Sequence, residues 1–344
     1  MSDLLDVSPA RRAAIDALAP HLLSARTVAL STHINADGDG CGSEAALALL
    51  LAQRGIAVRI VNPTPWPGMF DYLLPGLRND TPRGAAALQG VDRLVVLDIS
   101  DVRRLGALAD AVRALSPAPL VIDHHQPGEE PPGPVRFADT SACATGELVF
   151  DLAVALGLEI TPQVATALYT AILTDTGGFR FSNTSARALA IASRLITAGV
   201  SPEEMYRRIY ASMPAGRLRL LREVLETLEV DESLGLASVA IPAGALERHG
   251  LSGDDLDGIA EYPRSIAGTR LALLFRDLGH GKVKVSFRSV GDVDANALAA
   301  RFGGGGHLRA AGALVAGAPA DVRARVLAAA REVLAAGAGP PRMP

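Results

Sequence analysis

Apolar and polar positions group into two kinds of segment over residues 1–198. Short apolar runs that end abruptly in polar residues predict buried parallel strands at 27–32, 58–61, 93–98 and 120–123. Between and after these runs, the pattern predicts helices at 8–24, 43–54, 109–115, 144–156, 162–173 and 185–198. Strands that alternate with helices imply a parallel sheet covered on both faces. The fold class is therefore predicted to be α/β, with an N-terminal Rossmann-like domain over 1–198.

The pattern changes after residue 198. Segments 202–211 and 215–228 predict charged helices, which we assign to a helical linker over 199–231. Beyond it, strand patterns at 236–241, 270–275, 283–287 and 313–315 accompany helical patterns at 295–302 and 320–336. These segments predict a smaller C-terminal α/β domain with a mixed sheet over 232–338. The Pro- and Gly-rich piece 128–134 is expected to be an exposed loop, and the tail 337–344 to be disordered.

Composition narrows the class of protein. The chain has 344 residues, 49% of them apolar, and a formal net charge of −4, which excludes a disordered chain. Proteins that grip long duplex DNA usually have a basic surface, so the mild acidity favours a small substrate. The two cysteines, Cys41 and Cys143, are predicted to be free thiols, with a single disulfide as the alternative. Without a signal peptide or a membrane-spanning run, the cytoplasm is the expected location and no membrane partner is expected.

Acidic and imidazole groups follow the ends of predicted strands or helices in four segments. The segments are 33–39, 98–101, 123–125 and 172–178. The carboxyl ends of parallel strands meet at one edge of a sheet, where ligands bind in open α/β folds. We therefore expect this edge to gather six candidate metal ligands: His33, Asp37, Asp39, Asp98, His124 and Asp175.

Divalent cations would resolve the repulsion within such a cluster. Its four carboxylates carry a charge of −4 when ionised, which two divalent ions neutralise. A mixed imidazole and carboxylate set suits Mn²⁺ ahead of Zn²⁺, Co²⁺ or Mg²⁺, and two metals serve displacement at phosphorus. Asp123 is expected to orient a neighbouring histidine without binding metal. Singly, each Asp could be a helix N-cap and each His structural, but four such segments at one edge favour a metal site.

A glycine run forms a second candidate site, at residues 303–312. Such a run is often a flexible loop, but backbone N–H groups in a loop can also form an anion-binding nest. Here His307 adds a side-chain donor. The candidate nucleotide-binding residues are Gly304, Gly305, Gly306 and His307.

The first four segments resemble the four motifs of DHH phosphoesterases: His33-x-x-x-Asp37-x-Asp39, then Asp98, then Asp123-His124-His125, then Asp175. The resemblance implies one Mn²⁺ on His33, Asp37 and Asp98. It implies a second on Asp39, Asp98, His124 and Asp175, with Asp98 bridging. It also implies that Asp98 and His125 are the catalytic residues, His125 facing the substrate phosphate and helping to protonate the leaving group. One departure is Ala36, where the family usually has proline.

The glycine run resembles the signature of the DHH-associated C-terminal domain, which implies that this domain binds substrate. Arg288 matches a family position that contacts substrate phosphate, although such residues are also common at solvated strand ends. Arg104 and Arg180 match two further positions, where they would steer phosphate or form structural ion pairs. Phe70, Tyr72, Phe179 and Phe181 are candidates to stack on a base, with core packing as the alternative.

Length and domain order are most similar to the bacterial NrnA-type subfamily. That resemblance implies hydrolysis of short oligoribonucleotides, of pApA and of the 3′-phosphate of pAp, and a homodimer is a frequent state in the family. A cyclic di-AMP phosphodiesterase is the alternative, because the metal site would be the same. An inorganic pyrophosphatase would carry a different C-terminal domain, and a processive single-strand exonuclease would need a longer chain and a basic channel. A non-enzymatic nucleotide-binding protein would be expected to have lost a metal ligand, and all six are present.

Overall fold

The computed structural model describes residues 4–256 and 258–336, so the tail at 337–344 lies outside the described residues. It divides into two compact units, Met1–Ser212 and Met213–Pro344. The division falls inside the segment that the sequence predicts as a linker. Helix α7 (Pro202–Tyr210) belongs to the first unit and helix α8 (Ala215–Leu225) to the second.

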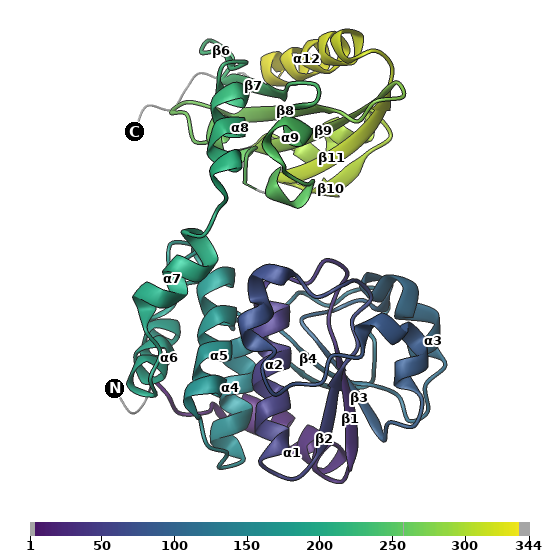
Figure 1. The fold of residues 1–344 in the computed structure, drawn as a ribbon, viewed down its shortest axis with the longest axis vertical. Helices are drawn as coiled ribbons and strands as arrows, with labels where there is room; N and C mark the ends of the chain where they lie inside the picture. The colour runs from purple at the N-terminus through teal and green to yellow at the C-terminus, as the bar shows by residue number, and fades with distance from the viewer. Residues whose placement is uncertain (1–3, 257, 337–344) are drawn as a thin grey trace. The chain divides into compact units, whose positions relative to one another are not determined.

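The first unit is built on a five-stranded sheet in which every pairing is parallel. The strand order is β2-β1-β3-β4-β5. Figure 1 shows β1, β2, β3 and β4 between helices α2 and α3. The strands are β1 (Thr27–Ser31), β2 (Ala57–Ile60), β3 (Arg93–Leu97), β4 (Leu120–Asp123) and β5 (Val135–Ala138). The predicted parallel α/β domain is confirmed, although β5, a short edge strand with two exposed positions, was not predicted.

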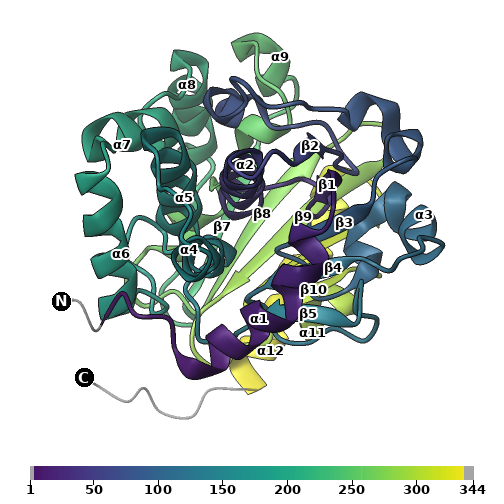
Figure 2. The ribbon, with the colours of Figure 1, turned by 90° about the horizontal axis from the view of Figure 1, so that it is seen from below.

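Helices cover both faces of this sheet. Alternate residues of β1 point to opposite sides, so Val28 and Leu30 enter one core and Ala29 the other. The first core is covered by α1 (Pro9–Leu23), α2 (Gly38–Ala52), α4 (Thr145–Ala155), α5 (Pro162–Asp175), α6 (Ala186–Thr197) and α7. The second is covered by α3 (Ala109–Arg113) and the 3₁₀ segments η2 (Thr81–Leu88) and η3 (Val102–Leu108). Figure 2 shows α2, α4 and α5 together on one side of the strands and α3 on the other.

Helix α2 begins at Gly38, five residues before the predicted start at residue 43. Asp37 caps it, because its Oδ1 accepts hydrogen bonds from the backbone N of Asp39 at 3.0 Å and of Gly40 at 3.1 Å. Glycine disfavours helix, which is why the pattern gave a later start. The packing explains the glycines: a Cβ on Gly42 would lie 2.5 Å from the backbone oxygen of Ala167 on α5. The consequence is that Asp39 lies in the first turn of a buried helix.

The second unit contains a six-stranded sheet in the order β10-β11-β9-β8-β7-β6. The sheet is mixed, which confirms the prediction for the C-terminal domain. Among the described strands of this unit, only β7 and β8 pair in parallel, and the other neighbours are antiparallel. The strands are β6 (Glu229–Asp231), β7 (Leu236–Ile241), β8 (Leu271–Asp277), β9 (Lys282–Ser289), β10 (Gly305–His307) and β11 (Ala310–Ala316). Short helices α9 (Ala245–His249), α10 (Glu261–Arg264) and α11 (Ala295–Ala300) join α8 and the closing helix α12 (Pro319–Ala336) around it.

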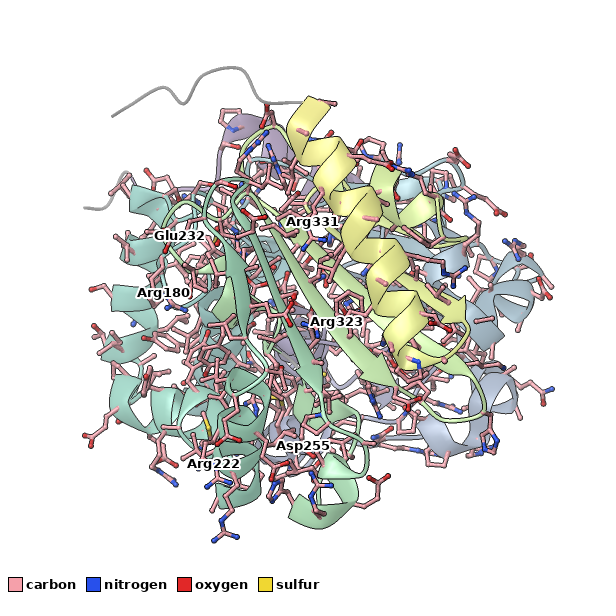
Figure 3. All side chains as sticks on the ribbon, turned by 90° about the horizontal axis from the view of Figure 1, so that it is seen from above. Arg180, Arg222, Glu232, Asp255, Arg323 and Arg331 are labelled. Carbon is pink, nitrogen blue, oxygen red and sulfur yellow. The ribbon has the colours of Figure 1, made fainter. Side chains whose placement is uncertain are left out.

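Helices pack on both faces of the second sheet. Helices α11 and α12 contribute to one core, and α8, α9 and the segment before α10 to the other. Arg323, labelled on α12 in Figure 3, places its guanidinium carbon 5.9 Å from the ring centroid of Phe275. The same guanidinium pairs with Glu229 at 3.0 Å, which ties α12 to the edge strand β6.

The glycine run is partly a strand, which corrects the prediction of a loop. Gly305–His307 form β10 and pair antiparallel with β11. A Cβ on Gly304 would lie 2.2 Å from the backbone oxygen of Gly312, and one on Gly306 would lie 2.6 Å from that of Ala310. Close approach of two backbones therefore explains these glycines without invoking flexibility.

Two predictions drawn from composition can be checked in the described residues. Cys41 and Cys143 are both free thiols and both buried, as predicted. No helix in the described part of the chain is long and apolar enough to cross a membrane.

Candidate metal centre

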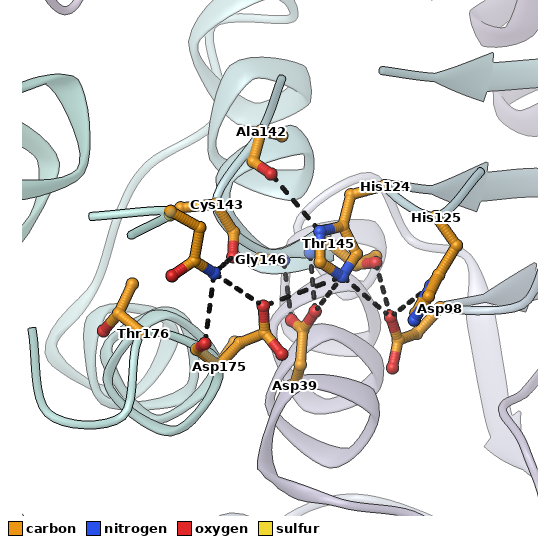
Figure 4. Close-up of polar contacts among 12 residues, drawn as sticks. Asp39, Asp98, His124, His125, Ala142, Cys143, Thr145, Gly146, Asp175 and Thr176 are labelled. Atoms are coloured by element: carbon orange, nitrogen blue, oxygen red, sulfur yellow. Dashed lines mark hydrogen bonds and ion pairs between the residues drawn. The ribbon is translucent and has the colours of Figure 1, made fainter. Parts of the chain in front are cut away.

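The predicted ligands of the first unit meet at one edge of the parallel sheet. His33 follows β1, Asp98 follows β3 directly, and His124 follows β4 directly. Helix α2 brings Asp37 and Asp39 at its start. Asp175, the last residue of α5, completes the cluster. Figure 4 shows Asp39, Asp98, His124 and Asp175 converging from these separate elements.

His33 directs its ring atom Nε2 to two carboxylates. Its Nδ1 lies 2.8 Å from the backbone oxygen of Ile34, an acceptor only, which places the proton on Nδ1. Its Nε2 lies 3.5 Å from Oδ2 of Asp37 and 3.4 Å from Oδ2 of Asp98. This Nε2 atom is buried and has no hydrogen-bond partner among the described residues. A lone pair aimed at carboxylate oxygens is the arrangement expected of a metal-binding histidine.

His124 repeats the arrangement on the other side of Asp98. Its Nδ1 lies 3.3 Å from the backbone oxygen of Ala142. Its Nε2 faces three carboxylates, at 3.5 Å from Oδ1 of Asp98, 3.6 Å from Oδ2 of Asp39 and 3.8 Å from Oδ2 of Asp175 (Figure 4). Both imidazoles are thus oriented by backbone carbonyls and both direct Nε2 into the carboxylate cluster.

Hydrogen bonds from α4 fix the position of Asp39. Its Oδ2 accepts from the backbone N of Thr145 at 2.6 Å, and its Oδ1 from that of Gly146 at 2.9 Å. Ser43 donates its hydroxyl to the same Oδ1 at 3.1 Å. The Thr145 hydroxyl also donates to Oδ1 of Asp98 at 3.0 Å. The first turn of α4 therefore holds two neighbouring carboxylates of the cluster at once.

Asp98 adopts a backbone conformation that non-glycine residues seldom use. Its φ is +61°. Such conformations cost about 1–3 kcal/mol and gather at functional sites. The turn directs the carboxylate to the sheet edge, where the side chain is almost fully buried.

Asn183 was not identified from the sequence but contacts Asp175 directly. Its Nδ2 donates to Oδ2 of Asp175 at 3.2 Å, to the backbone oxygen of Asp175 at 3.1 Å and to that of Cys143 at 2.9 Å. No local pattern in the sequence points to this contact. Asn183 thus orients the Asp175 carboxylate and connects the segment that follows α5 to the end of that helix and to Cys143.

The electrostatics of the cluster indicate missing positive charge. Burial, followed by repulsion from Asp98 and Asp175, raises the pKa of Asp39 well above its ordinary range. Burial and the charge of Asp98 raise the pKa of Asp175 to about 6. Burial opposes protonation of His33, but the carboxylates of Asp37 and Asp98, which can accept a hydrogen bond once Nε2 is protonated, outweigh it and raise the pKa of His33 to about 10. Asp39, Asp175 and His33 thus bind protons more strongly than isolated groups do, as ligands for a cation would. Asp37 differs, because burial is outweighed there by the interaction with His33, which lowers the pKa of Asp37.

The same atoms satisfy the geometry of a metal site. Three overlapping groups each bring their ligand atoms within 4.8 Å of one another: His33 with Asp37 and Asp98, Asp98 with His124 and His125, and Asp39 with His124 and Asp175. Nitrogen and carboxylate oxygen donors with no thiol suit a divalent cation. The residues present therefore fit divalent metal binding.

His125 and Asp123 form a pair beside the cluster. Nδ1 of His125 lies 2.9 Å from Oδ1 of Asp123, and the backbone N of His125 donates to the same oxygen at 3.2 Å. This hydrogen bond raises the pKa of His125 despite burial. His125 Nδ1 is also 3.4 Å from Oδ1 of Asp98. Asp101, by contrast, caps η3 and pairs with Arg103 at 2.6 Å.

The structure places the candidate phosphate-binding arginines in both units. The backbone oxygen of Arg104 accepts a hydrogen bond from the N of Ile34 at 2.9 Å, beside His33. The guanidinium charge of Arg104 opposes the rise in the pKa of His125. Arg180 donates its Nε to the backbone oxygen of Gly177 at 2.7 Å and is labelled in Figure 3. In the second unit, Arg288 on β9 pairs with Glu261 at 3.2 Å.

The strand register relates Arg288 to the glycine run. Ala310 on β11 lies opposite Arg288 on β9 and also opposite the backbone of His307 on β10. Gly304 comes just before β10, and Gly305 and Gly306 are in it. The second unit therefore gathers its predicted substrate-binding positions at one corner of its sheet.

Three of the four candidate stacking aromatics are engaged in packing. Phe70 is buried, and Phe179 lies 6.0 Å from the ring of Tyr169. The hydroxyl of Tyr72 lies 2.9 Å from Oγ1 of Thr170, and Arg208 covers its ring at 4.8 Å. Phe181 differs, because 57% of its surface is exposed.

Comparison with known proteins agrees with this geometry. Residues 27–172 match the DHH family, N-terminal domain, and residues 236–336 match the DHHA1 domain. The bifunctional oligoribonuclease and PAP phosphatase NrnA of Thermus thermophilus is 35% identical over 89% of each chain. The protein of the same name from Bacillus subtilis is 30% identical over 84% of this chain and 89% of its own.

A solved structure extends the similarity to the fold. The exopolyphosphatase-related protein from Bacteroides fragilis superposes with a TM-score of 0.84 at 26% identity, over 94% of this chain and 98% of that protein. The sequence motifs, the two matched domains and these relatives agree. The chain belongs to the DHH family.

Proposed function

We propose that this protein is a two-metal phosphoesterase that hydrolyses short oligoribonucleotides, including pApA, and removes the 3′-phosphate of pAp. The names of the two NrnA relatives support this substrate class. One structural observation carries the proposal. Asp98 directs Oδ2 to Nε2 of His33 at 3.4 Å and Oδ1 to Nε2 of His124 at 3.5 Å, so one carboxylate serves two imidazole-containing groups.

The proposed ligand sets share Asp98. His33, Asp37 and Asp98 would hold one ion, and Asp39, Asp98, His124 and Asp175 the other, with Mn²⁺ the expected metal. When bound, such a pair of ions lowers the pKa of the attacking water and stabilises negative charge on the phosphate oxygens. The protein keeps the ligand atoms in place through Thr145, Gly146 and Asn183.

His125 is proposed to supply the proton that the leaving oxygen needs. Its Nδ1 is engaged by Asp123, which leaves Nε2 free to donate. The same hydrogen bond raises its pKa, so the imidazolium persists to higher pH than an isolated histidine would allow. Asp123 thus positions the proton donor.

Substrate phosphates are proposed to contact arginine side chains and backbone N–H groups. Arg104 and Arg180 serve in the first unit. In the second unit the set is Arg288, Gly304, Gly305, Gly306 and His307. The match to the DHHA1 domain supports a substrate-binding role for residues 232–338 and speaks against an inorganic pyrophosphatase.

The test is turnover of pAp, pApA, a five-residue RNA and cyclic di-AMP, side by side. Each is measured with Mn²⁺, Mg²⁺, Zn²⁺ or Co²⁺, with a chelator and with Asp98→Asn as controls. The proposal expects metal-dependent turnover of the linear substrates, fastest with Mn²⁺, and little of the cyclic one. Cleavage of cyclic di-AMP at a comparable rate would instead identify a cyclic-dinucleotide phosphodiesterase. No cleavage of any of the four would refute the phosphoesterase proposal for this substrate class.

A further inference from the structure

Phe181 presents an aromatic ring to solvent in the segment that follows the candidate ligand Asp175. Its exposed fraction is 57%, whereas the seven other phenylalanines are buried or half-buried. Burial in a core therefore does not account for this residue, unlike Phe70 or Phe179.

The ring is held by the turn beneath it. The backbone N of Phe181 donates to the oxygen of Thr176 at 3.0 Å. The outer edge of the ring rests on Gly177, where a Cβ would lie 2.4 Å from Cζ and 2.5 and 2.6 Å from the two Cε atoms. Gly177 also has a φ of +57°. Only glycine fits both requirements, and the ring is thereby ordered before any ligand arrives.

Residues of the candidate metal centre precede and follow this turn in the sequence. Asp175 lies two residues before Gly177, and Asn183, which donates to the Asp175 carboxylate, lies two residues after Phe181. Two residues span at most about 7 Å, so the ring contact on Gly177 is close to the cluster. In a nucleotide a single sugar separates the base from the phosphate. This separation matches the short distance between the ring contact on Gly177 and the cluster.

The neighbouring residue adds a positive charge to the same turn. Arg180 uses its Nε to bind the oxygen of Gly177. Its two terminal nitrogens make no hydrogen bond with the described residues and remain available to an anion. An exposed ring next to a cation is the combination that binds single-stranded nucleotides, by stacking on the base and pairing with the phosphate.

We propose that Phe181 is the stacking surface for the base of the nucleotide whose phosphate lies at the metal centre. This inference rests on the proposed function and adds how the base is recognised. Stacking on a ring tolerates any base, because each has a π face. Phe181 would therefore strengthen binding of nucleotides without selecting among A, C, G and U.

A cycle of enzyme and substrate changes tests the contact. The substrates are pApA and two matched dinucleotides, each lacking one base. The enzymes are the wild type and Phe181→Ala. We expect Phe181→Ala to raise KM for pApA about 5- to 150-fold with little change in kcat. Loss of the stacked base should raise the wild-type KM by a similar factor, and the variant should show no further loss on that abasic substrate.

Three further variants separate stacking from a structural role. Phe181→Trp and Phe181→Tyr should keep KM low, because both side chains have a π face. Phe181→Leu should behave like Phe181→Ala, because leucine has no π face even though it keeps much of the apolar area. Leu189→Ala on α6 is the matched control, since Leu189 is similarly exposed at 51% and lies outside the turn. It should leave KM unchanged.

The outcomes distinguish this inference from the proposed function. If the wild type cleaves pApA and the effects of Phe181→Ala and of each missing base multiply independently, the ring does not touch a base and the inference is wrong. Equal loss on all three substrates would have the same meaning. If the wild type cleaves none of the linear substrates, the proposed function fails instead.

Discussion

Nε2 of His33 lies 3.4 Å from Oδ2 of Asp98, and in the neutral tautomer that donates Nδ1–H to the backbone oxygen of Ile34 both of these atoms are acceptors. Two acceptors this close, in a buried setting, repel each other unless a cation or an extra proton joins them. Asp98 faces His124 in the same way through its other oxygen. This one carboxylate is therefore the residue on which the metal hypothesis depends most.

Asp98→Asn should reduce turnover by more than about 100-fold, because it removes a charge shared by both proposed ligand sets while it keeps the side-chain volume. In chelator, the variant should melt at the wild-type temperature or above, since one repelling charge is gone. The rise in Tm on adding Mn²⁺ should shrink markedly. Asp110→Asn, on an exposed carboxylate, is the control. Retained turnover in Asp98→Asn would rule out the bridging role.

The sequence predicted the sheet edge well because its signals are local. The apolar runs before His33, Asp98 and His124 end abruptly in polar residues, and parallel strands place such ends together. The structure confirms the class of fold and brings all six predicted ligands into overlapping groups. The spacing of apolar residues and the order of the motifs along the chain were sufficient to predict the fold class and these six ligands.

Contacts between distant segments had no such signal. Asp39 is held by Thr145 and Gly146, 106 and 107 residues away, and nothing near Asp39 indicates this. The early start of α2 depends on packing against α5, which overrides the poor helix propensity of its glycines. The run at Gly304 and Gly306 has the composition of a loop, but its strand pairing is set by β11.

Arg288→Ala should raise KM for pApA about 10-fold and leave kcat nearly unchanged, because the residue is proposed to bind phosphate equally in the ground and transition states. Steady-state kinetics over a range of substrate concentrations measure both. Lys284→Ala is the control, since Lys284 is an exposed cation on the same strand, four residues away. A fall in kcat with an unchanged KM would contradict the proposed role.

Arg11→Met should destabilise the first unit by about 3–5 kcal/mol while the activity of folded protein is retained. Arg11 on α1 is buried and pairs with Asp139 at 2.6 Å, Glu147 at 2.6 Å and Asp151 at 2.8 Å. Without the charge of Arg11, the buried carboxylates of Glu147 and Asp151 are left with Arg187 as their cationic partner among the described residues. Urea denaturation measures the loss. The neighbouring Arg12→Ala, from an exposed pair with Asp16, should cost about 0–1 kcal/mol, and an equal loss in both variants would contradict the argument.

Glu44 on α2 is a fully buried carboxyl outside the proposed ligand set. Its Oε2 accepts from Nδ2 of Asn62 at 2.8 Å, and its Oε1 has no partner among the described residues. Asn62 in turn accepts from the backbone N of Thr32, next to His33. Burial raises the pKa of Glu44 from 4.5 to about 8, against the opposing effects of Asn62 and His33.

The raised pKa of Glu44 makes stability depend on pH with a definite sign. Between about pH 4.5 and pH 8 the folded protein keeps a proton that the unfolded chain has lost, so this group lowers the free energy of unfolding as pH rises. The slope is at most about 1.4 kcal/mol per pH unit. Glu44→Gln does not titrate and can still accept from Asn62. In chelator, its stability relative to wild type should therefore increase from pH 5 to pH 8, measured by urea denaturation, whereas the exposed control Glu247→Gln should show no such trend. A difference between Glu44→Gln and wild type that stays constant over this range would mean that Glu44 is already ionised in the folded protein.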